Sequence, residues 1–122
     1  MSESYGPRER IRKKKDFADL YRNGGCYRGP DFHLIFRPSP TGYARMSAVA
    51  SRKVGNAVDR SRARRRVREL FRRNKELLSE PLDMLMIAKK SLLETAWPGL
   101  VEEYGAALRY AARRRSGSGS TA

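Results

Sequence analysis

The spacing of apolar residues in the first half of the chain predicts a short helix followed by a strand. Residues 13–23, "KKKDFADLYRN", place Phe17, Leu20 and Tyr21 on one helical face, and the two glycines that follow are typical of a helix end. Residues 31–37, "DFHLIFR", alternate as expected for a strand that is partly covered on both faces.

A second strand is predicted shortly afterwards. Residues 44–52, "ARMSAVASR", roughly alternate, and the turn-forming stretch "PSPTG" separates them from the first strand. We therefore predict that the two runs form a hairpin. A short additional strand around Cys26–Arg28, just before Gly29 and Pro30, is an open alternative to a loop.

The second half of the chain predicts a helix, a buried strand and a final helix. Asn56 and Asp59 form a capping pair at the start of the first of these helices, and Pro81 ends the region. Residues 82–90, "LDMLMIAKK", are read as a buried strand, and Pro98 begins the last helix. The predicted core-facing stripes are Ala63, Val67, Leu70, Phe71, Asn74 and Leu78 on the first helix, and Leu100, Val101, Tyr104, Ala107, Leu108 and Ala111 on the second.

This order, α-(β)-β-β-α-β-α, corresponds to one small α+β sandwich. If the middle helix connects two neighbouring strands of one sheet, those strands are expected to be parallel. We expect residues 11–115 to form a single domain, residues 1–10 to be a flexible N-terminal arm, and residues 116–122, "SGSGSTA", to be a flexible Ser/Gly tail of linker composition.

Composition narrows the class of partner. The 122 residues carry a formal net charge of +14, which favours a polyanion, either nucleic acid or an acidic membrane surface. Cys26 is the only cysteine, so an intramolecular disulfide and a cysteine-based metal cage are excluded. The longest apolar run, "MLMIA" at 84–88, is too short to span a bilayer, and we expect a cytoplasmic protein.

The positive charge is concentrated between Ser51 and Arg73, where nine arginines and one lysine accompany only two acidic residues. Like charges four positions apart repel, so a merely solvated helix would intersperse acids, yet none occurs from Arg60 to Arg68. Free backbone N–H groups at the start of a helix also attract phosphate. We favour polyanion binding over a solvated face, and nucleic acid over a membrane, because guanidinium groups match phosphate in a bidentate manner.

No constellation typical of a self-sufficient enzyme is present. His33 is the only histidine and is read as a structural residue of a strand, and the acidic residues lack the spacing of metal ligands. Two roles remain open for Phe17 and Tyr21, core packing or stacking on unpaired bases, whereas Leu20 is assigned to the core.

The stretch "SRKVGNAVDRSRARRRVRELFR" resembles a pattern of the protein subunit of bacterial ribonuclease P, roughly S-K-K-x-G-x-A-V-x-R-N-R-x-K-R-x-x-R-E-x-F-R. The matching positions are Ser51, Lys53, Gly55, Ala57, Val58, Arg60, Arg62, Arg65, Arg68, Glu69, Phe71 and Arg72. Upstream, "RIRKKKDFADLYRNG" is similar to the family's basic first helix with paired aromatics, and "LDMLMIAKK" is similar to its D-x-x-x-I-A-R strand.

The resemblance implies a two-layer α-β-β-β-α-β-α sandwich with a left-handed β-α-β crossover. It also implies a protein subunit that assists a catalytic RNA in the endonucleolytic removal of the 5′ leader from precursor tRNA. The RNA would perform the chemistry with Mg²⁺, and the protein chain alone would supply no catalytic residue and no metal ligand. The alternative is a ribosomal or other structured-RNA-binding protein without a catalytic partner.

The resemblance further implies two groups of binding residues. Two departures accompany them: Ser61 stands where the family has Asn, and Ile35 stands where a groove tyrosine can occur. The residues implied to bind the catalytic RNA are Arg60, Ser61, Arg62, Arg64, Arg65, Arg68 and Arg72. Those implied to bind the leader, in a groove between the first helix and the sheet, are Phe17, Tyr21, Ile35, Arg52 and Lys53.

Overall fold

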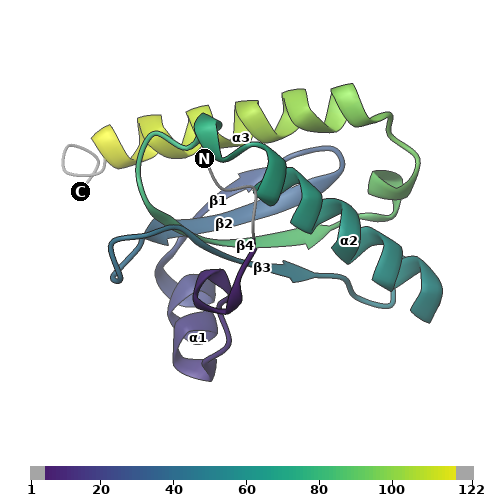
Figure 1. Cartoon of the computed structure of the whole chain (residues 1–122), viewed down its shortest axis with the longest axis horizontal. Coiled ribbons are helices and arrows are strands. Elements are labelled where there is room, and N and C mark those ends of the chain that lie inside the picture. Colours follow the sequence, from purple (N-terminus) through teal and green to yellow (C-terminus); the bar gives the residue numbers. More distant parts are fainter. Residues whose placement is uncertain (1–4, 118–122) are drawn as a thin grey trace.

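The computed structural model describes residues 5–117, with side chains described for residues 5–114. Three helices and a four-stranded sheet follow one another in the predicted order, which confirms the α+β class and the short first strand (Figure 1). The helices and strands are α1 (Lys14–Asn23), β1 (Gly25–Arg28), β2 (Phe32–Pro38), β3 (Arg45–Val49), α2 (Ala57–Arg73), β4 (Leu82–Ala88) and α3 (Trp97–Gly117). Short 3-10 turns occur at Pro7–Glu9 (η1), Lys75–Leu77 (η2) and Lys90–Leu93 (η3).

The strands lie side by side in the order β1-β2-β4-β3, so the predicted hairpin of residues 31–37 and 44–52 is wrong. β4 lies between β2 and β3, and the hairpin partner of β2 is β1. β4 is buried along almost its whole length, as a central strand must be, whereas a β2–β3 hairpin would have left this apolar strand at an edge. β3 and β4 pair in parallel through α2, as predicted, and this is the crossover for which the family resemblance implies a left-handed path.

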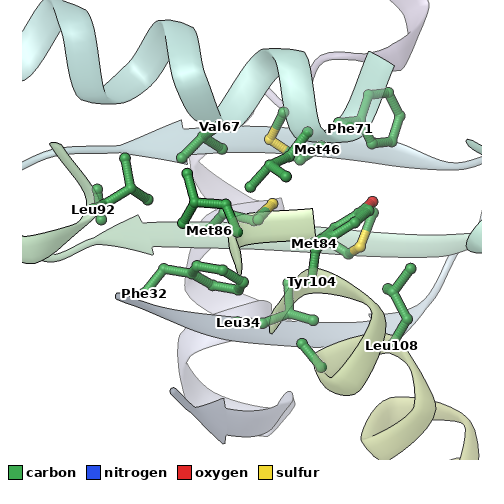
Figure 2. Packing of buried hydrophobic residues seen from close by; sticks show 14 of the residues in the cluster. Phe32, Leu34, Met46, Val67, Phe71, Met84, Met86, Leu92, Tyr104 and Leu108 are labelled. Carbon is green, nitrogen blue, oxygen red and sulfur yellow. The ribbon is translucent and has the colours of Figure 1, made fainter. Parts of the chain in front are cut away.

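The main core lies between the sheet and the helices α2 and α3. Phe32, Leu34 and Phe36 alternate along β2 and are buried on this side. Figure 2 shows strand residues Phe32, Leu34, Met46, Met84 and Met86 meeting Val67 and Phe71 of α2 and Tyr104 and Leu108 of α3. The helical stripes predicted from apolar spacing therefore cover this face of the sheet.

α1 packs on the opposite face of the sheet (Figure 1). There Ile11 and Leu20 join Ile35 of β2 and Leu85 of β4 in a second, smaller cluster, which confirms the core assignment of Leu20. α1 thus forms a partial third layer in addition to the two layers that the sequence predicts. Other residues of this face remain partly exposed, among them His33, Val49 and Ile87.

The stripe of α2 is shorter than helical spacing predicts. The helix ends at Arg73, and the Asn74 side chain donates a hydrogen bond to the carbonyl of Leu70, 2.9 Å away. Asn74 is buried as expected, but Leu78 follows the turn η2 and reaches the core as a half-buried residue outside the helix.

The N-terminal segment lies against the domain from residue 5 onward, where the sequence predicts a flexible arm. The Tyr5 ring packs edge-on against Phe71, with 5.5 Å between ring centroids, and Arg10 forms a parallel bridge with Met46. At the other end, α3 continues to Gly117, and the rest of the predicted tail, residues 118–122, lies outside the described residues.

Candidate nucleic-acid interface

The turn before α2 determines where its arginines begin. Gly55 has a φ of 147°, a region that favours glycine, and an added Cβ there would lie 2.3 Å from the Asp59 carboxylate. The predicted capping pair is present: the Asp59 backbone N–H donates to Asn56 Oδ1 (2.9 Å), and the Asn56 N–H donates to Asp59 (3.3 Å). The side chains of Asn56 and Asp59 therefore occupy part of the N-terminus of α2. This weakens the expectation that free backbone N–H groups at this N-terminus attract phosphate.

Four arginines of α2 are exposed, namely Arg62, Arg65, Arg68 and Arg73, and the first three lie at helical spacing on its solvent face. Arg62 lies 3.7 Å from the Asp59 carboxylate and its side chain is 54% exposed. Among the described residues, the guanidinium groups of Arg65 and Arg68 have no hydrogen-bond or ion-pair partner. α2 thus presents positive charge that the rest of the described chain does not neutralise.

The remaining predicted residues of this group have local partners. Arg60 is half-buried and donates to the carbonyl of Gly55 (2.9 Å), which explains how it is accommodated at the angle of the apolar stripe. Arg64 donates to the Ser61 hydroxyl (3.4 Å), and Ser61 itself is exposed. Arg72 forms an ion pair with Glu69, whose carboxyl pKa is lowered by that hydrogen bond.

Arg66 and Arg73 lie on the other flank of α2, and their contacts are internal. Arg66 donates to the carbonyls of Leu92, Leu93 and Thr95, at 2.8–3.1 Å, and so ties α2 to η3. The guanidinium of Arg73 lies over the Trp97 ring, 5.8 Å from its centroid. The arginine face of α2, formed by Arg62, Arg65 and Arg68, therefore lies on one side of the helix. Arg66 instead has a structural role, because it binds backbone carbonyls of the same chain.

Three of the residues predicted to bind the leader, Phe17, Tyr21 and Ile35, lie on the other side of the sheet, on α1 or beneath it. Tyr21 is 55% exposed, whereas Phe17 is half-buried against the small cluster that contains Ile35. Ile35 itself is only 9% exposed, so it can form part of the groove floor but offers little surface to a ligand. Arg52 and Lys53 are exposed in the turn between β3 and α2, so they belong to a different part of the chain from α1.

An ionic network that the sequence analysis missed fixes α1 to the sheet. Asp83 of β4 is completely buried and accepts hydrogen bonds from Arg37 and Arg45, which lie beside it on β2 and β3. Arg37 also pairs with Asp16 (2.8 Å) and Asp19 of α1. Hydrogen bonding with Asp83 raises the pKa of Arg45 although burial opposes it. The one sequence signal of this network is an aspartate in an otherwise apolar strand.

The sheet face beyond α1 is partly exposed, as the sequence predicts for β2, but the residues that meet there were not predicted. Cys26 and Ile87 pack at the edge of the small cluster, and His33 lies between β1 and β4 in the register of Arg28 and Ile87. Burial lowers the pKa of His33, and the positive charges of Lys89 and Arg28 lower it further. His33 is therefore neutral at neutral pH, and its charged neighbours make this end of the face basic.

The described residues form no group of three or more His, Cys, Asp or Glu side chains that could hold a metal ion. The three carboxylates that meet beside α1, those of Asp16, Asp19 and Asp83, are engaged by Arg37 and Arg45. Within the same part of the chain, no helix is long and apolar enough to cross a membrane.

Comparison with known proteins gives one consistent result. The family described as Ribonuclease P matches residues 6–112. The ribonuclease P protein component of Thermotoga maritima is 37% identical over 94 residues, which cover 77% of this chain and 80% of that protein. The solved structure of the RNase P protein from Thermotoga maritima superposes with a TM-score of 0.74 at 31% identity, covering 84% of this chain and 97% of the other. That of the Staphylococcus aureus RNase P protein superposes with a TM-score of 0.72 at 25% identity, covering 84% and 94%.

Proposed function

This chain belongs to the ribonuclease P protein family, and we propose that its arginine face and its α1 groove bind two different RNAs. It is the protein component of an endoribonuclease ribonucleoprotein that processes the 5′ ends of tRNA, and it therefore works with an RNA partner. In this proposal the RNA partner and the precursor substrate occupy opposite faces of the sheet.

The catalytic RNA is assigned to the arginine face of α2. The observation that carries this assignment is the exposure of Arg62, Arg65 and Arg68 on a helix whose other side is completely buried. Guanidinium groups on one helix face repel one another, and phosphates of a folded RNA would relieve that repulsion through bidentate contacts.

The unpaired 5′ leader of precursor tRNA is assigned to the groove beside α1. Tyr21 offers an exposed ring, Phe17 a half-exposed one, and Ile35 contributes to an apolar floor. Aromatic rings stack on bases without regard to sequence, and this suits a strand whose sequence varies among precursors. Arg52 and Lys53, exposed near the far end of β3, would contact its phosphates.

Magnesium is assigned to the RNA subunit. The described residues of this chain do not fit a magnesium site, because the carboxylates that cluster are already held by arginines. We therefore derive no catalytic step through a metal bound to the protein. The alternative of a structured-RNA-binding protein without a catalytic partner receives no support from the similar proteins.

Cleavage of precursor tRNA at low magnesium tests this assignment. The protein is added to its cognate ribonuclease P RNA, and we expect it to stimulate cleavage. The Arg62→Gln, Arg65→Gln, Arg68→Gln triple variant should lose most of this stimulation. A matched triple variant on α3, Arg109→Gln, Arg113→Gln, Arg114→Gln, removes the same charge and should retain it. No stimulation by the unaltered protein would contradict the proposal.

A further inference from the structure

The segment before α1 is fixed across the outer edge of β3. The Tyr5 hydroxyl donates to the carbonyl of Met46 (2.6 Å), and the backbone N–H of Ile11 donates to the same carbonyl (3.4 Å). The Tyr5 ring meanwhile packs against Phe71 of α2. The segment is therefore held from both sides, by an edge strand and by the helix that carries the arginine face.

The acidic residue of this segment is turned toward the domain. Glu9 accepts hydrogen bonds from the backbone N–H of Gly6 (2.9 Å) and from Lys75, which follows α2. Its charge is thereby balanced within the fold. Three arginines of the same segment, Arg8, Arg10 and Arg12, are exposed.

Two of these arginines, Arg10 and Arg12, act on Tyr5, whose ring packs on α2. Arg10 stacks over the Tyr5 ring, 4.9 Å from its centroid, and donates to the Tyr5 carbonyl. Arg68 lies one helical turn before Phe71, the ring that Tyr5 contacts. Burial raises the pKa of Tyr5, while the charges of Arg10, Arg68 and Arg12 oppose that rise, so all three act on one hydroxyl. Positive charge from α2 and from the segment before α1 therefore meets around Tyr5.

We propose that Arg10 and Arg12, together with Arg68, form a second phosphate-binding site for the structured RNA that α2 binds, and that Tyr5 holds the segment that carries Arg10 and Arg12 in place. This inference rests on the proposed function and extends its RNA surface beyond α2. A folded RNA is the partner because its phosphates can meet the segment at the edge of β3 and the helix α2 simultaneously.

The test measures binding of the cognate ribonuclease P RNA to the full chain, without precursor tRNA, across a salt series. The Arg10→Gln, Arg12→Gln variant should bind about tenfold more weakly near 0.1 M salt, and its log–log salt slope should fall by about 1.5, because each lost phosphate contact removes about 0.7–0.9 from that slope. The matched control Arg113→Gln, Arg114→Gln should retain the affinity and slope of the unaltered protein.

The role of Tyr5 has a separate readout. A Tyr5→Ala variant should lose hydrogen-exchange protection at the Ile11 amide and bind the RNA several-fold more weakly, whereas Tyr5→Phe keeps the ring and should lose less. Protection and affinity that both persist in Tyr5→Ala would overturn the positioning role.

The outcomes also separate this inference from the proposed function. If Arg10→Gln, Arg12→Gln binds as well as the unaltered protein while the α2 triple variant does not, the second site is overturned and the α2 assignment stands. If the α2 triple variant also binds normally, the proposed function itself fails.

Discussion

Phe17 and Tyr21 are one helical turn apart on α1, but their surroundings differ. Phe17 packs on the cluster of Ile35 and Leu85, while more than half of Tyr21 is open to solvent. The sequence left core packing and base stacking open for both, because periodicity places the two rings on one face but cannot say how far the sheet extends beneath them. The structure favours a mixed role for Phe17 and an exposed one for Tyr21.

Replacing Tyr21 with Ala should reduce the preference for precursor over mature tRNA by about five- to hundredfold. One stacked base contributes roughly 1–3 kcal/mol, and the exposed ring contributes little to folding. Phe17→Ala should reduce the preference too, but should also lower the free energy of unfolding by about 1–3 kcal/mol. Competitive binding and urea unfolding measure the two effects, with Leu77→Ala on η2 as a control. Unchanged discrimination in Tyr21→Ala would remove this residue from the groove.

Glu103 predicts how stability depends on pH. Burial and the neighbouring Asp31 carboxyl raise the pKa of Glu103 to about 7, and Glu103 accepts the backbone N–H of Asp31 at 2.9 Å. The unfolded chain ionises this group near pH 4.5, so the stabilisation is complete below that pH and is lost as pH rises through about 7. The full effect is roughly 3 kcal/mol.

Urea unfolding at about pH 5 and about pH 8 checks this prediction in the unaltered protein and in Glu103→Gln. The lowered pKa of His33 acts in the opposite direction below pH 6.5, so the difference between the two proteins is the informative quantity. Identical pH profiles would mean that Glu103 does not contribute.

At the scale of the element, α2 was the most predictable part of the chain. Its capping pair and the first four residues of its apolar stripe, Ala63 to Phe71, were predicted correctly because both depend on residues close in sequence. The fixed role of Arg66 could not be predicted, since its three carbonyl partners are supplied by η3 and the residues that follow it. An arginine run alone does not distinguish a free guanidinium from a structural one.

The cap of α2 can be tested on its own. Asn56→Ala should lower the free energy of unfolding by about 1 kcal/mol, because the Asp59 N–H loses its acceptor. Asn56→Ser should restore most of the loss, since its hydroxyl can accept the same hydrogen bond. Thermal or urea unfolding of both variants measures this. Equal destabilisation by Ala and Ser would argue against the cap.

At the same scale, the pairing of the strands was predicted wrongly. The sequence predicted a hairpin of β2 and β3 because a turn-rich stretch joins them, yet β4, more than 30 residues further along the chain than β3, is inserted between them. A local pattern identifies strands but not their partners. The apolar character of β4 was the available sign that it is central.

At the scale of the whole molecule, the fold separates two surfaces. α2 carries its exposed arginines on one side of the sheet, and α1 with Phe17 and Tyr21 packs on the other. The arginine-rich segment before α1 crosses the edge of β3 between them, from Tyr5 at α2 to Ile11 in the cluster beneath α1. The docking of the N-terminal segment was not predictable, because its contacts, such as Tyr5 with Phe71 and Glu9 with Lys75, join residues far apart in the sequence and leave no repeating pattern. The charge itself was evident from composition, but only the fold shows which arginines remain without partners.

The central claim is that the arginine face of α2 binds the catalytic RNA. The most direct measurement is the affinity of the full chain for its cognate ribonuclease P RNA as a function of salt. The Arg62→Gln, Arg65→Gln, Arg68→Gln variant should lower the log–log slope by about 2–3 and the affinity by on the order of a hundredfold near 0.1 M salt. The matched triple variant on α3 should leave both unchanged. An α2 variant with an unaltered slope, or an equal loss in the α3 variant, would contradict the claim.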